Sequence, residues 1–258
     1  MNAALQVPQI KLLVFDLDGT AIPYGGYDSM PAPEEIQAVR RAKDKVKVAV
    51  ATGRSLVSAK PVVEALSIRD PGIFSGGTQI LYPSDGSVVW QKPINPKTAL
   101  KVRRICSDYA SKTYVNNGSK VVSFDRSDQK HPIFIVYIAH LTKQQVTRLT
   151  KALVSYPDIS LQYTRNWLKH DSPFFDIHVT HTDATKKHAM QELLSITGVP
   201  SHQVMVVGDD NNDLPLFENA GLKVAMGNGT PELKAKADFV TGSVDRHGLA
   251  QAIRKFIL

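Results

Sequence analysis

The sequence predicts an α/β protein with a Rossmann-like, doubly wound parallel sheet and an α+β domain inserted into it. Three observations predict this class. Short apolar runs alternate with helical stretches at both ends of the chain, the strands expected in the middle alternate apolar and polar residues, and acidic residues follow two of the apolar runs. Strands covered on both faces consist of continuous apolar residues, whereas half-exposed antiparallel strands alternate. The change of pattern therefore indicates two kinds of sheet in one chain.

The parallel sheet is predicted from short runs rich in valine and isoleucine, separated by helical stretches. One helix is expected to open at Pro33, because a proline followed by two acids is typical of a helix start. A second helix follows Gly53, and a third ends at Gly198. Alternation of this kind favours a sheet with helices on both faces. The runs are residues 10–15, 46–51, 73–74, 204–207 and 223–226.

The middle of the chain predicts a separate domain. Its stretch Phe175-Asp176-Ile177-His178-Val179 shows the alternation of a half-exposed antiparallel strand. We expect residues 83–182 to form the inserted α+β domain and residues 1–82 and 183–258 to form the core, with crossings near Tyr82 and Thr182. The helices expected in the insertion are residues 96–111 and 141–156, and the strands are residues 121–124, 132–139, 159–163 and 174–180.

Composition limits the class of protein. The chain has 258 residues, of which 43% are hydrophobic and 21% charged, as in ordinary globular proteins. Its single cysteine, Cys106, cannot form an internal disulfide. The first residues lack the pattern of a signal peptide, and no apolar run approaches the roughly 20 residues of a spanning helix. We therefore expect a cytoplasmic protein with no membrane partner.

The net charge of +7 is uneven, because nearly all of the excess falls between Pro83 and Asp183. This basic middle is either a solvated surface or a module that attracts anions, such as small phosphorylated substrates. The sequence has no run of lysine and arginine, and no aromatic residues interleaved with basic ones, that would mark a nucleic-acid surface. We expect no nucleic-acid partner.

The first chemical motif is Asp16-Leu17-Asp18-Gly19-Thr20, which follows the first apolar run. Ligands of parallel sheets gather beyond the carboxyl ends of the strands. Two carboxylates placed there repel one another unless a cation compensates, and Mg²⁺ is a hard cation that prefers oxygen ligands. A capped turn is the alternative, since aspartate and glycine both favour turns. Chance would give this pattern on the order of once per hundred thousand positions, so a site is favoured.

A second acidic segment, Gly208-Asp209-Asp210-Asn211-Asn212-Asp213, follows another apolar run. Asp209 is expected at the end of the strand, with Asp213 one helical turn later on the same face. Alone, the segment could be an acidic helix start, which the helix dipole favours. Together with Asp16 and Asp18 at a neighbouring strand end, it predicts a metal site.

Two further groups complete the predicted site. Thr52, in Thr52-Gly53-Arg54, follows the second apolar run and is expected at a third strand end. Lys186 is expected in the first turn of a helix, where a cation opposes the dipole. Contact with phosphate and Asp16 would explain that placement better than a surface position. Lys187 competes for this role, and a solvated lysine pair is the remaining alternative.

These four segments, in this order, resemble the motifs of the haloacid dehalogenase (HAD) superfamily of phosphatases. The insertion between the second and third segments resembles the type-2 cap of that superfamily. The stretch Ala220-Gly221-Leu222-Lys223-Val224-Ala225-Met226-Gly227-Asn228 is similar to Cof-type, sugar-phosphatase-like members of subclass IIB. The resemblance spans about residues 11–252. It departs from the family at Ser75-Gly76-Gly77, where Asn-Gly is common, and at Lys187, where glycine is common.

The resemblance implies a Mg²⁺-dependent phosphatase in which Asp16 is the nucleophile and forms an aspartyl-phosphate. It implies that Asp18 is the general acid and base. The implied metal ligands are the Asp16 carboxylate, the Asp18 main-chain carbonyl and Asp209, with Asp213 as a supporting acid at the metal. The residues implied in binding phosphate or substrate are Thr52, Gly53, Arg54, Lys186 and Asn212.

The substrate is expected to be a small phosphorylated metabolite, with a sugar phosphate favoured by the resemblance alone. The inserted domain is expected to close over the site and contact the leaving group. Arg165, Lys169 and His170 are candidate contacts, although a surface role is favoured for each. Two other functions stay open: a phosphomutase of the phosphomannomutase type, and a non-catalytic regulator that binds a phospho-ligand on the same fold. The oligomeric state cannot be predicted.

Overall fold

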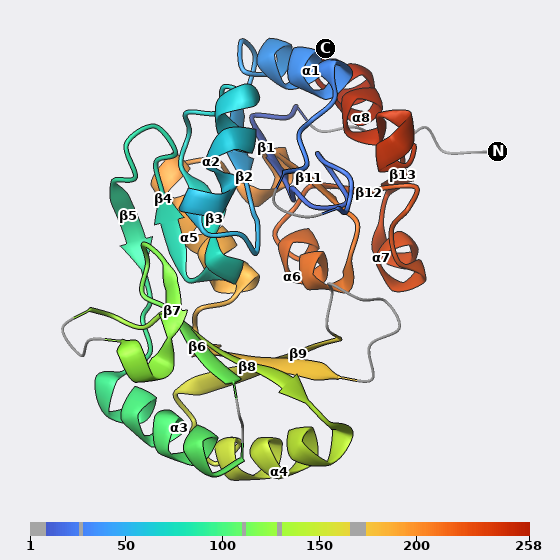
Figure 1. Ribbon diagram of the computed structural model, residues 1–258. Helices are drawn as coiled ribbons and strands as arrows, with labels where there is room; N and C mark the ends of the chain where they lie inside the picture. The colour runs from blue at the N-terminus through green and yellow to red at the C-terminus, as the bar shows by residue number, and fades with distance from the viewer. Residues whose placement is uncertain (1–8, 26–27, 110–111, 128–130, 166–173) are drawn as a thin grey trace. The chain divides into compact units, whose positions relative to one another are not determined.

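The structure is a computed structural model that describes residues 9–25, 28–109, 112–127, 131–165 and 174–258 (Figure 1). The chain forms two compact units. Unit 1 comprises Met1–Trp90 and Lys186–Leu258, and unit 2 comprises Gln91–Thr185.

Unit 1 is built on a five-stranded sheet in the order β13-β12-β11-β1-β2. Every neighbouring pair in this sheet is parallel. All four residues of β1 and all five of β11 are buried, as expected of central strands covered on both faces. The strands are β1 (Leu12–Phe15), β2 (Lys47–Val50), β11 (Val204–Gly208), β12 (Leu222–Ala225) and β13 (Phe239–Val240).

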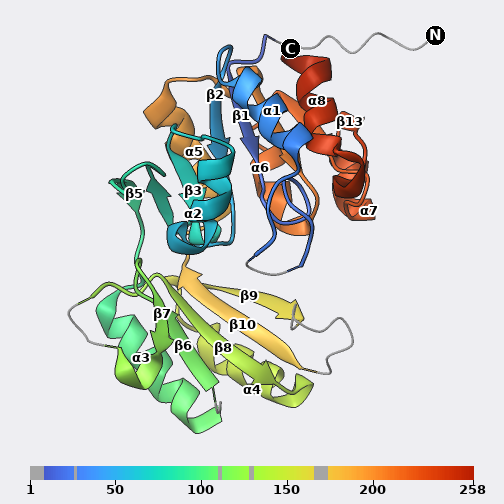
Figure 2. The same cartoon turned by 45° about the horizontal axis from the view of Figure 1, so that its top comes forward.

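Helices cover both faces of this sheet (Figure 2). Because successive side chains of a strand point to opposite faces, Leu13 and Phe15 of β1 pack with α1, α2 and α8, whereas Leu12 and Val14 pack with α5, α6 and α7. The predicted doubly wound parallel sheet is therefore confirmed. The helices are α1 (Pro33–Ala42), α2 (Leu56–Ala65), α5 (Lys186–Thr197), α6 (Leu214–Phe217), α7 (Pro231–Lys236) and α8 (Gly248–Phe256).

The segment after β2 forms a small sheet of its own, in the order β3-β4-β5. An isolated parallel bridge between Ala51 and Ile73 links it to the end of β2. Because β5 extends this sheet, residues 83–90 belong to unit 1, and the first crossing lies at Trp90 and not near Tyr82. The second crossing lies at Thr185, close to the expected Thr182. The elements are β3 (Gly72–Phe74), the 3₁₀ turn η1 (Ser75–Gly77), β4 (Gln79–Leu81) and β5 (Val88–Gln91).

Unit 2 is an antiparallel five-stranded sheet in the order β7-β6-β8-β10-β9, with α3 and α4 packed against one face. Its core joins Val102 and Leu149 of the helices to Ile138 and Ile177 of the strands. Strand β6 was not predicted, because it has only one apolar residue besides a tyrosine. The elements are α3 (Pro96–Tyr109), β6 (Lys112–Asn116), β7 (Val121–Ser123), β8 (Ile135–Leu141), α4 (Lys143–Leu153), β9 (Ile159–Arg165) and β10 (Phe175–His181).

Short 3₁₀ turns also connect these elements: η2 (Phe124–Arg126), η3 (Ser201–Gln203), η4 (Asn211–Asp213) and η5 (Val244–Arg246). Within the described parts of both units, no helix combines the length and the apolar character that crossing a bilayer requires.

Candidate active site

The carboxyl ends of three parallel strands carry the predicted site residues of unit 1. The register pairs Phe15 of β1 with Val207 of β11 and with Val50 of β2. Asp16 continues β1, and its main-chain N–H donates to the carbonyl oxygen of Val207 at 3.2 Å. Asp209 directly follows β11. Since parallel strands end at the same edge of the sheet, the register brings segments distant in sequence to one place.

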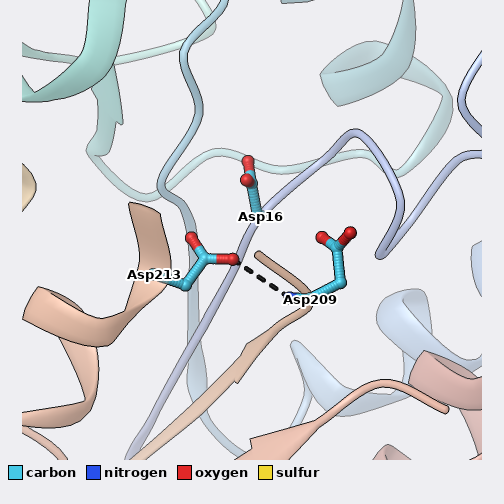
Figure 3. Close-up of side chains that lie close together, drawn as sticks. All are labelled: Asp16, Asp209 and Asp213. Carbon is cyan, nitrogen blue, oxygen red and sulfur yellow. Dashed lines mark hydrogen bonds between the residues drawn. The ribbon is translucent and has the colours of Figure 1, made fainter. Parts of the chain in front are cut away.

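Three carboxylates meet at this edge (Figure 3). Asp16, Asp209 and Asp213 are all buried, and each offers an oxygen within 4.8 Å of those of the other two. The main-chain N–H of Asp209 donates to Oδ2 of Asp213 at 3.0 Å, which fixes η4 against the end of β11. Gly208 is needed here, because a Cβ at this position would lie 2.5 Å from Oδ2 of Asp213. The two predicted acidic segments therefore form one cluster.

Lys186 lies within this cluster as the first residue of α5. Its Nζ is 3.1 Å from Oδ2 of Asp16 and 2.7 Å from Oδ1 of Asp213. Lys187 instead points outward and pairs with Glu218 at 2.6 Å, with its side chain 47% exposed. Of the two candidate lysines, the structure brings Lys186 to the acidic cluster.

In the Thr52-Gly53-Arg54 segment, the arginine contacts another predicted site residue, Asp18. Thr52 is fully buried, and its Oγ1 accepts a hydrogen bond from the main-chain N–H of Arg54 at 3.1 Å. Gly53 is exposed. The Arg54 guanidinium donates to both carboxylate oxygens of Asp18, from Nε at 2.8 Å and from Nη2 at 2.6 Å. Arg54, predicted to bind substrate, is thus paired with the predicted general acid.

Asn212, another predicted phosphate-binding residue, lies exposed on η4. Candidates in unit 2 cannot be placed, because Lys169, His170 and the side chain of Arg165 lie outside the described residues.

Sequence reasoning missed three polar residues around the cluster. Thr20 Oγ1 donates to Oδ1 of Asp209 at 2.9 Å, and Tyr24 Oη donates to Oδ2 of the same carboxylate at 2.5 Å. Asn228 Nδ2 donates to the carbonyl oxygen of Gly19 at 2.8 Å. Thr20 and Asn228 lie in segments that carry the family resemblance, which was a usable signal. Nothing in the spacing of Tyr24 pointed to Asp209.

The electrostatics of the cluster follow from burial of excess negative charge. Burial raises the pKa of Asp16 to about 8, Lys186 opposes this rise, and Asp213 adds to it. Burial likewise raises the pKa of Asp209 to about 6, although the Tyr24 hydrogen bond opposes it. Burial alone would lower the pKa of Lys186, but the carboxylates of Asp16 and Asp213 outweigh it and hold this pKa above its ordinary value. Lys186 stays protonated, and the protein itself does not fully compensate the acids.

A hard divalent cation fits this donor set. The side chains of Asp16 and Asp209 supply carboxylate oxygens, and burial, with neighbouring carboxylates adding to it, raises their pKa values, so a bound cation would favour their ionised forms. Asp213 already accepts a hydrogen bond at each oxygen, from Lys186 and from the Asp209 main chain. This geometry suits Asp213 to a supporting position beside the cation.

Comparison with known proteins decides the family. The family model of haloacid dehalogenase-like hydrolases matches residues 13–253. The chain belongs to this family. The match includes every acidic residue of the cluster and Lys186, and it confirms the resemblance inferred from the four segments.

Relatives and solved structures extend over nearly the whole chain. A Bacillus subtilis protein named 5-amino-6-(5-phospho-D-ribitylamino)uracil phosphatase is 26% identical, covering 100% of both chains. A Staphylothermus marinus phosphoglycolate phosphatase is 25% identical, covering 96% of this chain and 98% of its own. A HAD phosphatase from Bacteroides thetaiotaomicron has a TM-score of 0.81 at 21% identity, covering 98% of this chain and 99% of its own. A subclass IIB sugar phosphatase has a TM-score of 0.76 at 20% identity, covering 95% of this chain and 98% of its own.

The structural likenesses show a common fold, and the family model shows a hydrolase. The family model, the relatives and the solved structures together confirm the predicted enzyme class. This HAD family member is a hydrolase of phosphate esters.

Proposed function

We propose that this HAD hydrolase uses Mg²⁺ to release phosphate from a small phosphorylated metabolite through an aspartyl-phosphate on Asp16. One observation carries the proposal: Asp16, at the end of β1, is buried beside Lys186 and within 4.8 Å of the Asp209 and Asp213 carboxylate oxygens. A carboxylate held by an ammonium group next to a place for a cation is suited to attack phosphorus.

The first step forms a bond between an Asp16 oxygen and phosphorus and breaks the bond to the ester oxygen, which leaves with a proton from Asp18. Splitting the reaction in this way divides one difficult displacement into two easier ones. Lys186 and the main-chain N–H of Leu17 hold the Asp16 carboxylate, at 3.1 Å and 2.7 Å. The Lys186 ammonium also compensates charge on the phosphoryl oxygens.

In the second step Asp18 takes a proton from water, the water oxygen attacks phosphorus, and Asp16 is released as a carboxylate with free phosphate. Mg²⁺, held by Asp16, Asp209 and the Asp18 main-chain carbonyl, would neutralise phosphoryl charge. Thr52, buried at the end of the neighbouring strand, would donate its hydroxyl to a phosphoryl oxygen.

Asp18 needs its proton at the start of this sequence, yet Arg54 holds its carboxylate at both oxygens. With both oxygens accepting hydrogen bonds from Arg54, neither is placed to donate a proton to a leaving group. We therefore propose that Asp18 separates from Arg54 before it protonates the leaving group. Arg54 would then contact substrate, the role that the family resemblance implies.

A sugar phosphate is the substrate class we favour, because a solved structure with the same fold is named a sugar phosphatase. The relatives named for phosphoglycolate and for a ribityl phosphate are also phosphatases of small phosphate monoesters. The role of the inserted unit in choosing among such substrates stays a prediction.

The test is a panel of phosphate monoesters assayed for free phosphate with and without Mg²⁺. We expect hydrolysis that requires the metal and is abolished by Asp16→Asn. Asp85→Asn is a matched control, because Asp85 is a fully exposed carboxylate in the turn before β5. Full activity in an Asp16→Asn protein shown by mass spectrometry not to have deamidated would refute the nucleophile.

The same panel separates the alternatives. Appearance of hexose 6-phosphate from hexose 1-phosphate, without free phosphate, would indicate a mutase. Absence of turnover across the panel, with phosphate esters still bound, would indicate a regulator.

A further inference from the structure

The loop after β1 places a tyrosine hydroxyl on the acidic cluster. The ring of Tyr24 is largely exposed, at 60% for the residue. Its Oη nevertheless reaches inward and donates to Oδ2 of Asp209 at 2.5 Å. A largely exposed residue thus has its hydroxyl group held on a buried acid of the cluster.

The surrounding backbone is arranged so that this contact can form. Gly19 has a φ of +78°, and a Cβ there would lie 2.1 Å from Oδ2 of Asp209 and 2.5 Å from Cε2 of Tyr24. Only glycine leaves room for the ring and the carboxylate to meet over this turn, and it also accepts the positive φ without strain. Asn228 ties the turn in place through the Gly19 carbonyl.

The two oxygens of Asp209 are each held by one hydroxyl group, Oδ1 by Thr20 and Oδ2 by Tyr24. Two donors on the two oxygens fix the rotation of the carboxylate. Each carboxylate oxygen has two lone pairs, so both oxygens keep one for a cation. The hydroxyl groups therefore orient Asp209 without using up its capacity to bind metal.

We propose that Tyr24 is a positioning residue for the cation, whose hydroxyl fixes the Asp209 carboxylate in the orientation that binds Mg²⁺. The proposal rests on the function proposed above and adds a residue to it. Groups that orient a metal ligand commonly change metal affinity by about 10- to 100-fold when they are removed.

The decisive variant is Tyr24→Phe, which keeps the ring and removes only the hydroxyl. Mg²⁺ alone is titrated into the full chain by isothermal titration calorimetry, without substrate. We expect the Kd for Mg²⁺ to rise about 10- to 100-fold, with circular dichroism unchanged. Tyr82→Phe is the matched control, because Tyr82 is a partly exposed tyrosine of the same unit outside the acidic cluster, and its Kd should equal that of the wild type.

Kinetics and a second variant separate positioning from packing. For Tyr24→Phe we expect the Mg²⁺ concentration for half-maximal rate to rise, with kcat largely restored at saturating Mg²⁺. Tyr24→Leu also removes the ring, and its Kd for Mg²⁺ should match that of Tyr24→Phe. An unchanged or tighter Kd in Tyr24→Phe overturns the proposal, as does a defect confined to Tyr24→Leu.

The titration also distinguishes this proposal from the proposed function. A wild-type chain that binds Mg²⁺ but hydrolyses no ester would refute the function while the Tyr24 comparison still supports the positioning role. A wild-type chain that binds no Mg²⁺ refutes both.

Discussion

Asp18 shows how one side-chain contact constrains the chemistry. Its carboxylate is one third exposed and accepts two hydrogen bonds from Arg54. The cluster that could hold a cation contains Asp16, Asp209 and Asp213 and does not use this carboxylate. The side chain of Asp18 therefore lies outside that cluster, which suits its proposed role of carrying and releasing a proton.

We expect Asp18→Asn to slow hydrolysis of a sugar phosphate by roughly 10²- to 10⁴-fold, the usual cost of losing a general acid. The loss should be smaller for an aryl phosphate, because its leaving oxygen needs less protonation. Steady-state rates on both substrates check this, and equal losses on the two would contradict a general-acid role.

The two adjacent lysines provide a matched pair. Lys186→Met leaves the buried acids Asp16 and Asp213 without the ammonium group that contacts both, so we expect the metal-free protein to lose about 3–5 kcal/mol in its free energy of unfolding. Lys187→Met breaks a surface pair with Glu218 and should cost less than about 1 kcal/mol. Urea titration measures both values, and similar losses would show that Lys186 does not stabilise the cluster.

At the scale of secondary structure, the site depends on tight turns at the strand ends. Gly208 ends β11 against η4, and a Cβ there would lie 2.5 Å from Oδ2 of Asp213. Gly53 follows β2 in open space, with nothing within 4 Å of a Cβ built on it. The two glycines therefore differ in what a methyl group would displace.

We expect Gly208→Ala to destabilise the protein by about 1–3 kcal/mol, the usual cost of overpacking, and to weaken Mg²⁺ binding by moving Asp213. Gly53→Ala should leave the melting temperature unchanged or slightly higher. Thermal unfolding with and without Mg²⁺ measures both effects. A Gly208→Ala protein as stable as the wild type would mean that η4 moves freely.

At the scale of the whole molecule, the buried acids link stability to pH. Asp16 and Asp209 keep their protons in the folded state up to pKa values of about 8 and about 6, whereas the unfolded chain loses them near the ordinary value of 3.8. Between these limits the folded state binds more protons, so stability falls as the pH rises. A divalent cation favours the ionised carboxylates and reverses this loss.

We therefore expect Mg²⁺ to raise the melting temperature more at about pH 8 than at about pH 5. Differential scanning fluorimetry at both values, with and without the metal, checks this. A shift that is equal or larger at the lower pH would contradict the linkage.

Glu35 supplies the control for this experiment. It is 1% exposed on α1, and burial raises its pKa to about 7, so it also makes the protein less stable as the pH rises. Glu35→Gln should weaken the dependence of the metal-free melting temperature on pH. It should leave the larger Mg²⁺-induced rise in melting temperature at the higher pH unchanged.

The sequence by itself determined the class of fold, the order of the four segments and the strand ends that carry Asp16, Thr52 and Asp209. These features are local: apolar runs define strands, and acids that follow them lie at strand ends. Apolar runs did not predict β6, because a short, mostly polar strand has no pattern that separates it from a loop.

Only the tertiary structure decided which side chains meet. It placed Lys187 beside Glu218, paired Arg54 with Asp18, and brought Tyr24 to Asp209 from a loop without a recognisable motif. It also kept β5 with unit 1 through its pairing with β4. The physical reason is that these contacts depend on the register of strands and the path of loops between residues far apart in the chain. Apolar periodicity and turn propensity do not record that information.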